Sequence, residues 1–356
     1  MEGKLFAGLT WSRTGRLEKD TLPRIAVTMG YAGGIGPEIM VKTLSTAKNR
    51  YLCRPIVIGD SKIIHAIAKT CGLAISWNII ESPEQAEFKP EEIDLVDLHN
   101  ISGGEFEYAK VIPSVGKASG EYLEIAWKAA MNDIVDGVVS GTLNKEALHQ
   151  GGYAFRDELE FFSKITGSQR PFSLGVTGDL WCVPVTDHIS FKEITKGITR
   201  QSVLFHITAI DEKMRRYGFD RPRIAVAALN VHGGEGGLFG DEEKTAITPA
   251  IEEARNLGIE VSGPFPADTI FIRAQNGEFD SIVGMYHDQI NIGRKLIGIL
   301  KGTTLFMGLP VPCGTTAHGT AFDKAGKGVA SPASMEDTLR IVSRLSQRGW
   351  SGARPL

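Results

Sequence analysis

Three histidines of the chain each follow directly on an apolar, strand-like run. They are His188 in VTDHIS, His232 in LNVHGGEGG and His287 in MYHDQ. In open α/β sheets, ligands gather at the carboxyl ends of strands, so side chains in these positions can converge on one site. Neutral imidazoles bind divalent metals that act as Lewis acids on substrate oxygens. The pattern indicates a metal site, and it leaves open the alternative that each histidine only hydrogen-bonds a nearby loop.

Two other side chains are candidates for acid–base chemistry or substrate binding. Asp268, in GPFPADTIF, can act as an acid or base or, in the plainer role, as a helix cap. Lys295 comes eight residues after His287 and can reach the same site, although an exposed lysine is the plainer interpretation. Nucleophilic catalysis has little support, because the chain has no GxSxG motif and no cysteine beside a histidine in sequence.

Two glycine-rich segments are candidates for ligand binding. GYAGGIGPE (30–38) stands between a predicted strand and a predicted helix, where free backbone N–H groups and the helix dipole can hold an anion, or it is a structural turn with Pro37 in the first helical turn. It is not the dinucleotide fingerprint GxGxxG, because the third glycine is missing. HGTAFDKAGKG (318–328) can wrap a ligand with its backbone, or it is a loop with glycines at positive φ.

Apolar runs that alternate with helical patterns must position these residues. The predicted strands include residues 25–29, 54–60, 136–141, 223–230 and 280–289. Helical spacing separates them, for example over 121–135 and 245–258, and residues 333–345 should form a terminal helix with Ser334 and Asp337 as a capping box. Strands that alternate with helices predict an α/β protein with a parallel sheet covered on both faces.

The composition is that of an ordinary globular protein. The 356 residues are 42% hydrophobic and 23% charged with a net charge of −3, which argues against disorder and against nucleic acid as a partner. No apolar run is long enough for a membrane helix and no signal peptide is evident, so we expect a cytoplasmic protein without a membrane partner. The four cysteines are far apart and should be reduced thiols.

Taken together, the motifs resemble those of the 4-hydroxythreonine-4-phosphate dehydrogenase (PdxA) family, from about residue 23 to 346. The motifs are GIGPEI (34–39), TLNKEAL (142–148), LNVHGGEGGLFGDEE (229–243), PADT (266–269), MYHDQ (285–289), MGLP (307–310) and AHGTAFDKAGKG (317–328). The resemblance implies an isocitrate/isopropylmalate dehydrogenase-like α/β fold, with two domains flanking a cleft and assembly as a homodimer. The expected boundaries are an extension over 1–22, one domain over 23–150 with 300–356, and a second over 151–299.

The resemblance also implies the site. His188, His232 and His287 match the family's metal ligands, with His287 contributed across the dimer interface, and the metal would be Zn, or Mg, Mn or Co. Lys295 and Asp268 match catalytic residues, and Lys295 also matches a substrate-binding lysine. NAD or NADP would bind without the Rossmann fingerprint, and the implied contacts are Gly308, Leu309, His318, Gly319, Thr320, Ala321, Asp323 and Gly326. The expected reaction is oxidation of a hydroxyl group of a small-molecule substrate, followed by loss of CO₂.

The chain departs from the family at several positions. Tyr31 replaces an acidic residue, Thr304 an asparagine and Cys313 a phosphate-contacting arginine, and DELE (157–160) replaces GHTE, so that Glu158 and Leu159 stand where the family binds substrate. A carboxylate where a phosphate needs donors predicts poor binding of a phosphorylated substrate. Lys295 alone should not compensate, although Arg156 or Arg294 could.

These departures predict a divergent PdxA-like dehydrogenase that oxidises an unphosphorylated hydroxy or dihydrodiol carboxylate. Two alternatives remain open. One is an authentic 4-hydroxythreonine-4-phosphate dehydrogenase of pyridoxal phosphate biosynthesis. The other is a homologue that binds a metal or a ligand without catalysis, which NAD(P) binding would exclude.

Overall fold

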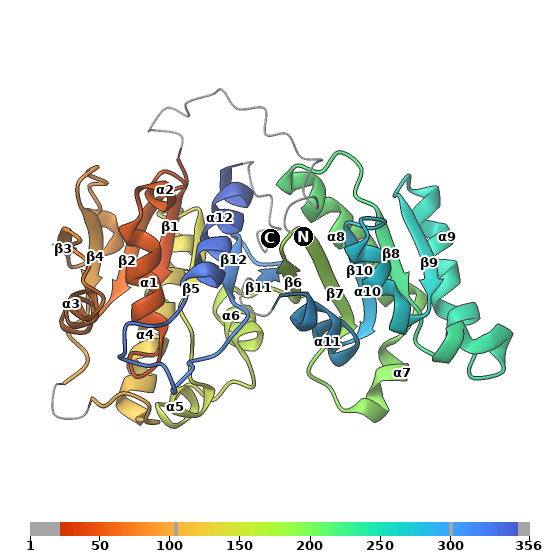
Figure 1. The fold of residues 1–356 in the computed structure, drawn as a ribbon, viewed down its shortest axis with the longest axis horizontal. Helices are drawn as coiled ribbons and strands as arrows, with labels where there is room; N and C mark the ends of the chain where they lie inside the picture. The colour runs from red at the N-terminus through yellow and green to blue at the C-terminus, as the bar shows by residue number, and fades with distance from the viewer. Residues whose placement is uncertain (1–21, 103–105, 299–301, 348–356) are drawn as a thin grey trace, which may run out of the picture.

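The computed structural model describes residues 22–102, 106–298 and 302–347, and the predicted extension over 1–22 falls outside this range except for Leu22. The strands within it form one twelve-stranded sheet in the order β3-β4-β2-β1-β5-β12-β11-β6-β7-β10-β8-β9. Helices cover both faces of this sheet (Figure 1). The α/β fold predicted from the sequence is therefore confirmed. Because the sheet runs unbroken through both halves, the exact domain boundaries stay a prediction.

The first half of the chain forms a parallel block of five strands. The strands are β1 (Arg24–Thr28), β2 (Arg54–Gly59), β3 (Trp77–Ile80), β4 (Ile93–Asp97) and β5 (Gly137–Ser140). The helices are α1 (Gly36–Ser45), α2 (Ala47–Arg50), α3 (Ser61–Thr70), η2 (Pro83–Gln85), α4 (Pro113–Met131), α5 (Lys145–Gln150) and α6 (Glu158–Thr166). Helix α4 begins eight residues before the predicted start at 121, at Pro113, which favours the first helical turn.

The second half contributes the other parallel block, β7, β10, β8 and β9, and the three strands that join the two blocks. Of these, β12 pairs with β5 in parallel, whereas the pairs β12–β11, β11–β6 and β6–β7 are antiparallel. The strands are β6 (Phe172–Thr177), β7 (Leu180–Thr186), β8 (Ile224–Ala227), β9 (Val261–Phe265), β10 (Ser281–Tyr286), β11 (Gly302–Met307) and β12 (Cys313–Thr316). The helices are η3 (Phe191–Glu193), α7 (Ile194–Gly197), α8 (Arg200–Tyr217), η4 (Val231–Gly237), η5 (Glu243–Ile247), α9 (Thr248–Asn256), α10 (Ala267–Gln275), α11 (His287–Gly298) and α12 (Ala333–Gln347).

Two details of the prediction are wrong. The strand expected over 280–289 ends at Tyr286, and α11 begins directly at His287. Ser334 does not cap the terminal helix, because it is buried inside α12 and its hydroxyl donates to the carbonyl oxygen of Gly302. The C-terminal helix is thereby tied to the start of β11, in the middle of the sheet. All four cysteines are unpaired, as expected.

Candidate active site

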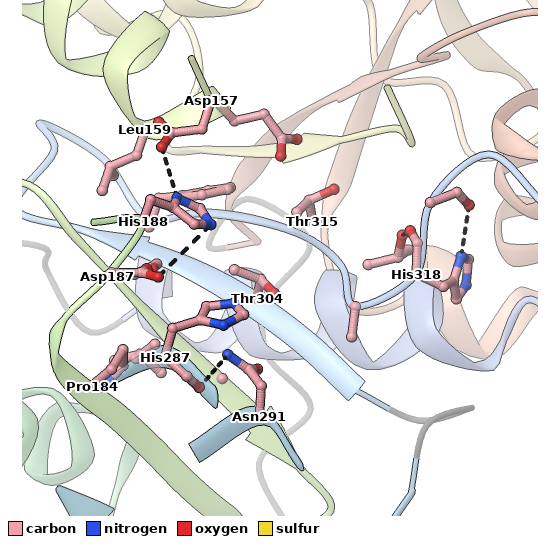
Figure 2. Close-up of a pocket in the computed structure, with 18 of the residues that line it drawn as sticks. Asp157, Leu159, Pro184, Asp187, His188, His287, Asn291, Thr304, Thr315 and His318 are labelled. Atoms are coloured by element: carbon pink, nitrogen blue, oxygen red, sulfur yellow. Dashed lines mark hydrogen bonds and ion pairs between the residues drawn. The ribbon is translucent and has the colours of Figure 1, made fainter. Parts of the chain in front are cut away.

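A cavity of about 300 Å³ opens where the two parallel blocks meet. The end of β5, the first turn of α6 and strands β11 and β12 supply one side, and strands β6 and β7 with helix α11 supply the other. Figure 2 shows that the side chains of Asp157, His188, His287, Thr304 and Thr315 converge here. Residues more than 100 positions apart in the sequence therefore share one pocket.

Three potential metal ligands meet at this cavity. Asp187, His188 and His287 each offer a ligand atom, and these atoms all lie within 4.8 Å of one another. The imidazole rings of His188 and His287 have their centroids 5.5 Å apart. The Oδ1 atom of Asp187 is buried, lies 3.7 Å from Nε2 of His188 and has no hydrogen-bond partner among the described residues, whereas Oδ2 accepts a hydrogen bond from the hydroxyl of Ser173. An unsatisfied carboxylate oxygen beside two imidazoles has the chemistry that a divalent cation requires.

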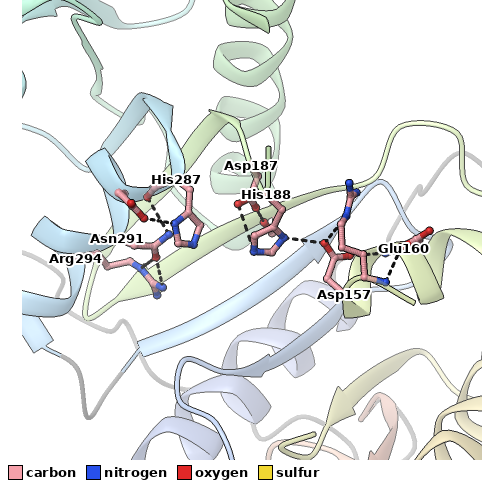
Figure 3. A network of polar contacts seen from close by, with 10 residues as sticks. Asp157, Glu160, Asp187, His188, His287, Asn291 and Arg294 are labelled. Carbon is pink, nitrogen blue, oxygen red and sulfur yellow. Dashed lines mark hydrogen bonds and ion pairs between the residues drawn. The ribbon is translucent and has the colours of Figure 1, made fainter. Parts of the chain in front are cut away.

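Carboxylates orient both histidines from the far side of their rings. Nδ1 of His188 lies 2.8 Å from Oδ2 of Asp157, and Nδ1 of His287 lies 2.6 Å from Oδ1 of Asp288. Each ring therefore has Nε2 available for a metal, in the arrangement common to metal-binding histidines. The hydrogen bond with His188 lowers the pKa of Asp157 to about 2 and raises the pKa of His188. Figure 3 shows this polar network on both sides of the cluster.

The predicted set of three histidines does not assemble within one chain. His232 is exposed on the turn after β8, where its Nδ1 lies 3.4 Å from Glu235, and it does not belong to the ligand cluster found among the described residues. Residues 232–236 all have positive φ, so the left-handed turn leads the chain away from β8. His287, in contrast, meets His188 in its own chain. The expectation that His287 must come from a partner is therefore corrected, and Asp187 is a candidate ligand that sequence reasoning missed.

The two predicted catalytic side chains lie in different places. Lys295 lines the cavity. Asp268 is exposed in the first turn of α10 and is not among the lining residues. The segments that carry Asp268 and His232 follow the neighbouring strands β9 and β8, so both side chains lie at one edge of the sheet, outside the cavity of their own chain.

The predicted substrate-binding residues divide in a similar way. Glu158, Leu159 and Thr304 line the cavity with Lys295, and burial raises the pKa of Glu158 to about 7. Cys313 does not line it. This cysteine is fully buried in β12, where loss of water raises the pKa of its thiol. The side chain of a cysteine at this position is too short to reach the cavity, whereas the longer side chain of an arginine could.

Part of the predicted cofactor segment reaches the same cavity. His318 and Gly319 line it, on the side of Figure 2 away from His188 and His287. The loop between β12 and α12 carries Thr320, Ala321, Asp323 and Gly326. Gly308 and Leu309 are not among the lining residues. Leu309 is fully buried, and Gly308 adopts a φ of 74° against the backbone of Arg170, where a Cβ would come within 2.7 Å.

The segment GYAGGIGPE supports this loop. Glu38 is fully buried and accepts hydrogen bonds from the backbone N–H groups of Gly328 and Ala330, at 3.1 and 2.5 Å. Lys42 donates to Glu38 and to the carbonyl oxygens of Gly328 and Ala330. At Gly34 a Cβ would lie 2.7 Å from Thr320, so the loop packs directly on this glycine. The segment thus makes a structural contact that holds the predicted cofactor loop, in agreement with the plainer of its two interpretations.

Tyr31, which replaces an acidic residue of the family pattern, also has a structural role. Its ring is fully buried. The hydroxyl donates to the carbonyl oxygen of Lys110 and accepts from the N–H of Ile112. This departure therefore does not alter the cavity.

Comparison with known proteins agrees with these observations. The family model described as pyridoxal phosphate biosynthetic protein PdxA matches residues 51–342. The chain belongs to the PdxA family. A D-threonate 4-phosphate dehydrogenase of Cupriavidus necator is 39% identical over 330 residues, which cover 92% of this chain and 99% of the relative. The PdxA-family chain is an oxidoreductase, as predicted.

Solved structures of two other dehydrogenases share its fold. A 4-hydroxythreonine-4-phosphate dehydrogenase from Klebsiella pneumoniae superposes with a TM-score of 0.79 at 34% identity, covering 92% of this chain and 98% of the other. A terephthalate 1,2-cis-dihydrodiol dehydrogenase from Burkholderia xenovorans gives a TM-score of 0.63 at 27% identity, covering 90% and 98%. None of the helices in the described ranges is long and apolar enough to cross a membrane.

Proposed function

We propose that this protein is a metal- and NAD(P)-dependent dehydrogenase that oxidises a secondary hydroxyl group of a phosphorylated hydroxy acid. The observation that carries this proposal is the cluster of Asp187, His188 and His287 on the cavity that His318 and Gly319 also line. The C. necator relative is named for D-threonate 4-phosphate. That name supports a small hydroxy-carboxylate phosphate as the substrate class.

The metal would bind Nε2 of His188, Nε2 of His287 and Oδ1 of Asp187. These three groups fit a divalent cation, because no described residue forms a hydrogen bond with the carboxylate oxygen and both rings are oriented through Nδ1. Such a cation acidifies a bound hydroxyl group and steadies negative charge on its oxygen. Mixed imidazole and carboxylate ligands suit Zn, Mn or Co. Mg, which the family resemblance also implies, is the fourth candidate metal.

The chain's own residues would orient the substrate around this centre. Lys295 is our candidate for a direct contact with the reacting end, because it lines the cavity on the same helix as His287. The nicotinamide cofactor supplies the acceptor for hydride, and the segment over 318–326 would hold its adenosine end. If the oxidised hydroxyl is β to the carboxylate, the product is a β-keto acid, which readily loses CO₂. Decarboxylation is therefore part of the proposal.

A second copy of the chain would complete the site. Next to His232, three large apolar side chains are exposed: Val231, Leu238 and Phe239. On the side of the histidine pair, Phe191 and Leu296 are 77% and 83% exposed. Exposed apolar groups of this size around a ligand-binding edge mark an interface. We propose that a homodimer buries them and brings His232 and Asp268 of one protomer to the histidine pair of the other.

A second candidate substrate class is an unphosphorylated hydroxy or dihydrodiol carboxylate. Glu158 inside the cavity and the absence of an arginine at position 313 favour it. The relative from B. xenovorans is named for such a dihydrodiol. Its identity to this chain is 27%, against 39% for the relative named for a sugar-acid phosphate, so we place it second.

A direct assay separates the two classes. Formation of NADH or NADPH would be followed by absorbance with purified protein, a divalent metal and either D-threonate 4-phosphate or D-threonate. We expect turnover of the phosphorylated acid, abolished by EDTA and restored by metal. Turnover of the unphosphorylated acid alone would favour the second candidate. Absence of cofactor binding in a thermal shift assay would instead support a protein that has lost catalysis.

A further inference from the structure

Arg294 is a buried arginine in the wall of the cavity. Only 5% of the residue is exposed, yet it is one of the lining residues. Its guanidinium donates from Nε and Nη2 to Oδ1 of Asn291, and from Nη1 to the carbonyl oxygen of Thr303 at 3.4 Å. No carboxylate of the described residues forms an ion pair with it, and burial lowers its pKa.

A buried cation with neutral partners only is costly. Charged side chains that leave water are normally paired, because hydrogen bonds to amide and carbonyl oxygens replace only part of the lost hydration. Within the described part of the chain, three of the five guanidinium N–H groups have the partners named above, which leaves two for a ligand. The missing counter-charge points to an anion that enters the cavity.

The neighbouring strands are shaped to admit this side chain. Gly175 of β6 lies under the guanidinium, and a Cβ there would come within 2.5 Å of Cζ of Arg294. Gly175 pairs with Thr304 of β11, and Thr304 pairs with Thr315 of β12. Side chains at paired positions share one face of a sheet. The guanidinium of Arg294 and the side chains of Thr304 and Thr315 therefore lie on the same face of the sheet, at the wall of the cavity.

Arg294 also lies at a suitable separation from the metal cluster. His287, Asn291 and Arg294 follow each other at intervals of four and three residues along α11, so they occupy one face of the helix (Figure 3). Seven residues of helix span about 10 Å. A small linear substrate can thus place its reacting hydroxyl near His287 and its far end near Arg294.

We infer that Arg294 binds the phosphate group of the substrate and supplies the cation that position 313 lacks in this chain. The inference rests on the proposed function, because it assumes a phosphorylated substrate. The planar guanidinium matches two phosphate oxygens, and the hydroxyl of Thr304 can donate to the remaining oxygen, whereas the hydroxyl of Thr315 donates to the carbonyl oxygen of Ser140. The cation of the phosphate site would thus come from Arg294 on helix α11 instead of from position 313 on strand β12.

The test compares Arg294→Gln and Arg294→Lys with the wild-type protein. Arg50→Gln is the matched control, since Arg50 borders a separate hollow that shares no lining residue with the cavity. Kinetic constants would be measured for D-threonate 4-phosphate and for D-threonate. The increase in melting temperature that inorganic phosphate causes would be measured in parallel, because it reports anion binding independently of turnover.

We expect Arg294→Gln to lower kcat/KM for the phosphorylated acid by about 100-fold or more, mainly through KM, and to leave kcat/KM for D-threonate within a few-fold. Arg294→Lys should retain an intermediate value, and phosphate protection should disappear in Arg294→Gln only. An equal loss with both acids would overturn the assignment and place the carboxylate at Arg294. Unchanged phosphate protection in a folded Arg294→Gln would overturn anion binding altogether.

The two failures can be distinguished. If the wild-type protein oxidises neither acid, the proposed function fails, while phosphate protection that depends on Arg294 still supports an anion site. If the wild type oxidises the phosphorylated acid and Arg294→Gln does so equally well, the function stands and the role of Arg294 is wrong. Gly175→Ala gives an independent check, because its Cβ displaces the guanidinium without removing it and should reproduce the selective rise in KM.

Discussion

Thr186 and Tyr286 are register partners in the parallel pair of β7 and β10, and each is the last residue of its strand. The hydroxyl of Thr186 also donates to the carbonyl oxygen of Met285 at 2.8 Å. Since the two strands stop level with each other, the residues that follow them emerge side by side. This pairing is why His188 and His287, 99 positions apart in the sequence, have adjacent rings.

The first prediction concerns the ligands of the metal. Replacing Asp187 by Asn keeps the shape of the side chain but removes the charge on Oδ1, which lies 3.7 Å from Nε2 of His188 and has no hydrogen-bond partner among the described residues. We expect the affinity for Zn²⁺ or Mn²⁺, measured by calorimetry, to fall at least 10-fold, as it should in His188→Ala. Asp179→Asn, in the turn between β6 and β7, is the control. Equal affinities in Asp187→Asn and wild type would remove this aspartate from the site.

Asp157 should act on the metal through His188. Its carboxylate holds Nδ1 of the ring at 2.8 Å, and its pKa of about 2 keeps it ionised at every pH at which a histidine can bind metal. Asp157→Asn should weaken metal binding by about 10- to 100-fold and leave the number of bound metals unchanged. Metal content at saturation and the dissociation constant together test this. A lost site, instead of a weakened one, would make Asp157 a ligand.

The sequence alone located one part of this site and not the other. An apolar run followed by a polar tip identifies a strand end, so His188 and His287 could be predicted, and the motif VTDHIS even contains Asp187. What the motifs do not contain is the order of the strands and the path of the turns. His232 follows a strand in the same way, but it lies on a turn whose residues 232–236 have positive φ, and it is not part of the ligand cluster found among the described residues.

Burial was equally hard to predict from the sequence. Cys313 and Thr315 are two residues apart in β12 and therefore face the same side of the sheet. Cys313 is nevertheless fully buried, whereas Thr315 lines the cavity. Arg294 follows His287 by seven residues, which is two turns of a helix. Because residues 280–289 were predicted as a strand, that spacing did not indicate a shared helix face. The role of Glu38 depends on contacts with residues 290 and 292 positions away, which no local pattern reveals.

Glu158 should make stability depend on pH. Burial raises its pKa from 4.5 to about 7, so the folded state binds more protons than the unfolded state between these values. Stability therefore falls as pH rises from about 4.5 to 7, by on the order of 2 kcal/mol for this partly exposed group. Denaturation at pH 5 and pH 8 would measure the loss. Glu158→Gln should lose less stability than wild type over this interval, and equal losses in both proteins would contradict the raised pKa.

Glu38 should couple the glycine-rich segment to cofactor binding. Glu38→Gln replaces an acceptor of backbone N–H groups by an amide and leaves the Lys42 ammonium without its buried partner. We expect a loss of about 2–4 kcal/mol in the free energy of unfolding, and a higher KM for NAD or NADP with unchanged metal affinity. Glu146→Gln, which alters an exposed residue of α5 whose carboxylate accepts a hydrogen bond from Gln150, serves as the control. Unaltered cofactor binding would separate Glu38 from the loop's function.

The last prediction tests whether His232 acts in the partner's cavity. His188→Ala and His232→Ala should each be inactive as homodimers. In a mixed dimer of the two variants, one cavity combines an intact His188 and His287 pair with an intact His232 from the other protomer, and the second cavity lacks both. Random exchange of equal amounts makes half of the dimers mixed, so roughly a quarter of the wild-type activity should return. Recovery should also appear as restored metal binding, which does not depend on substrate. If His232 instead served the cavity of its own chain, every cavity in the mixture would retain one defect and no activity would return.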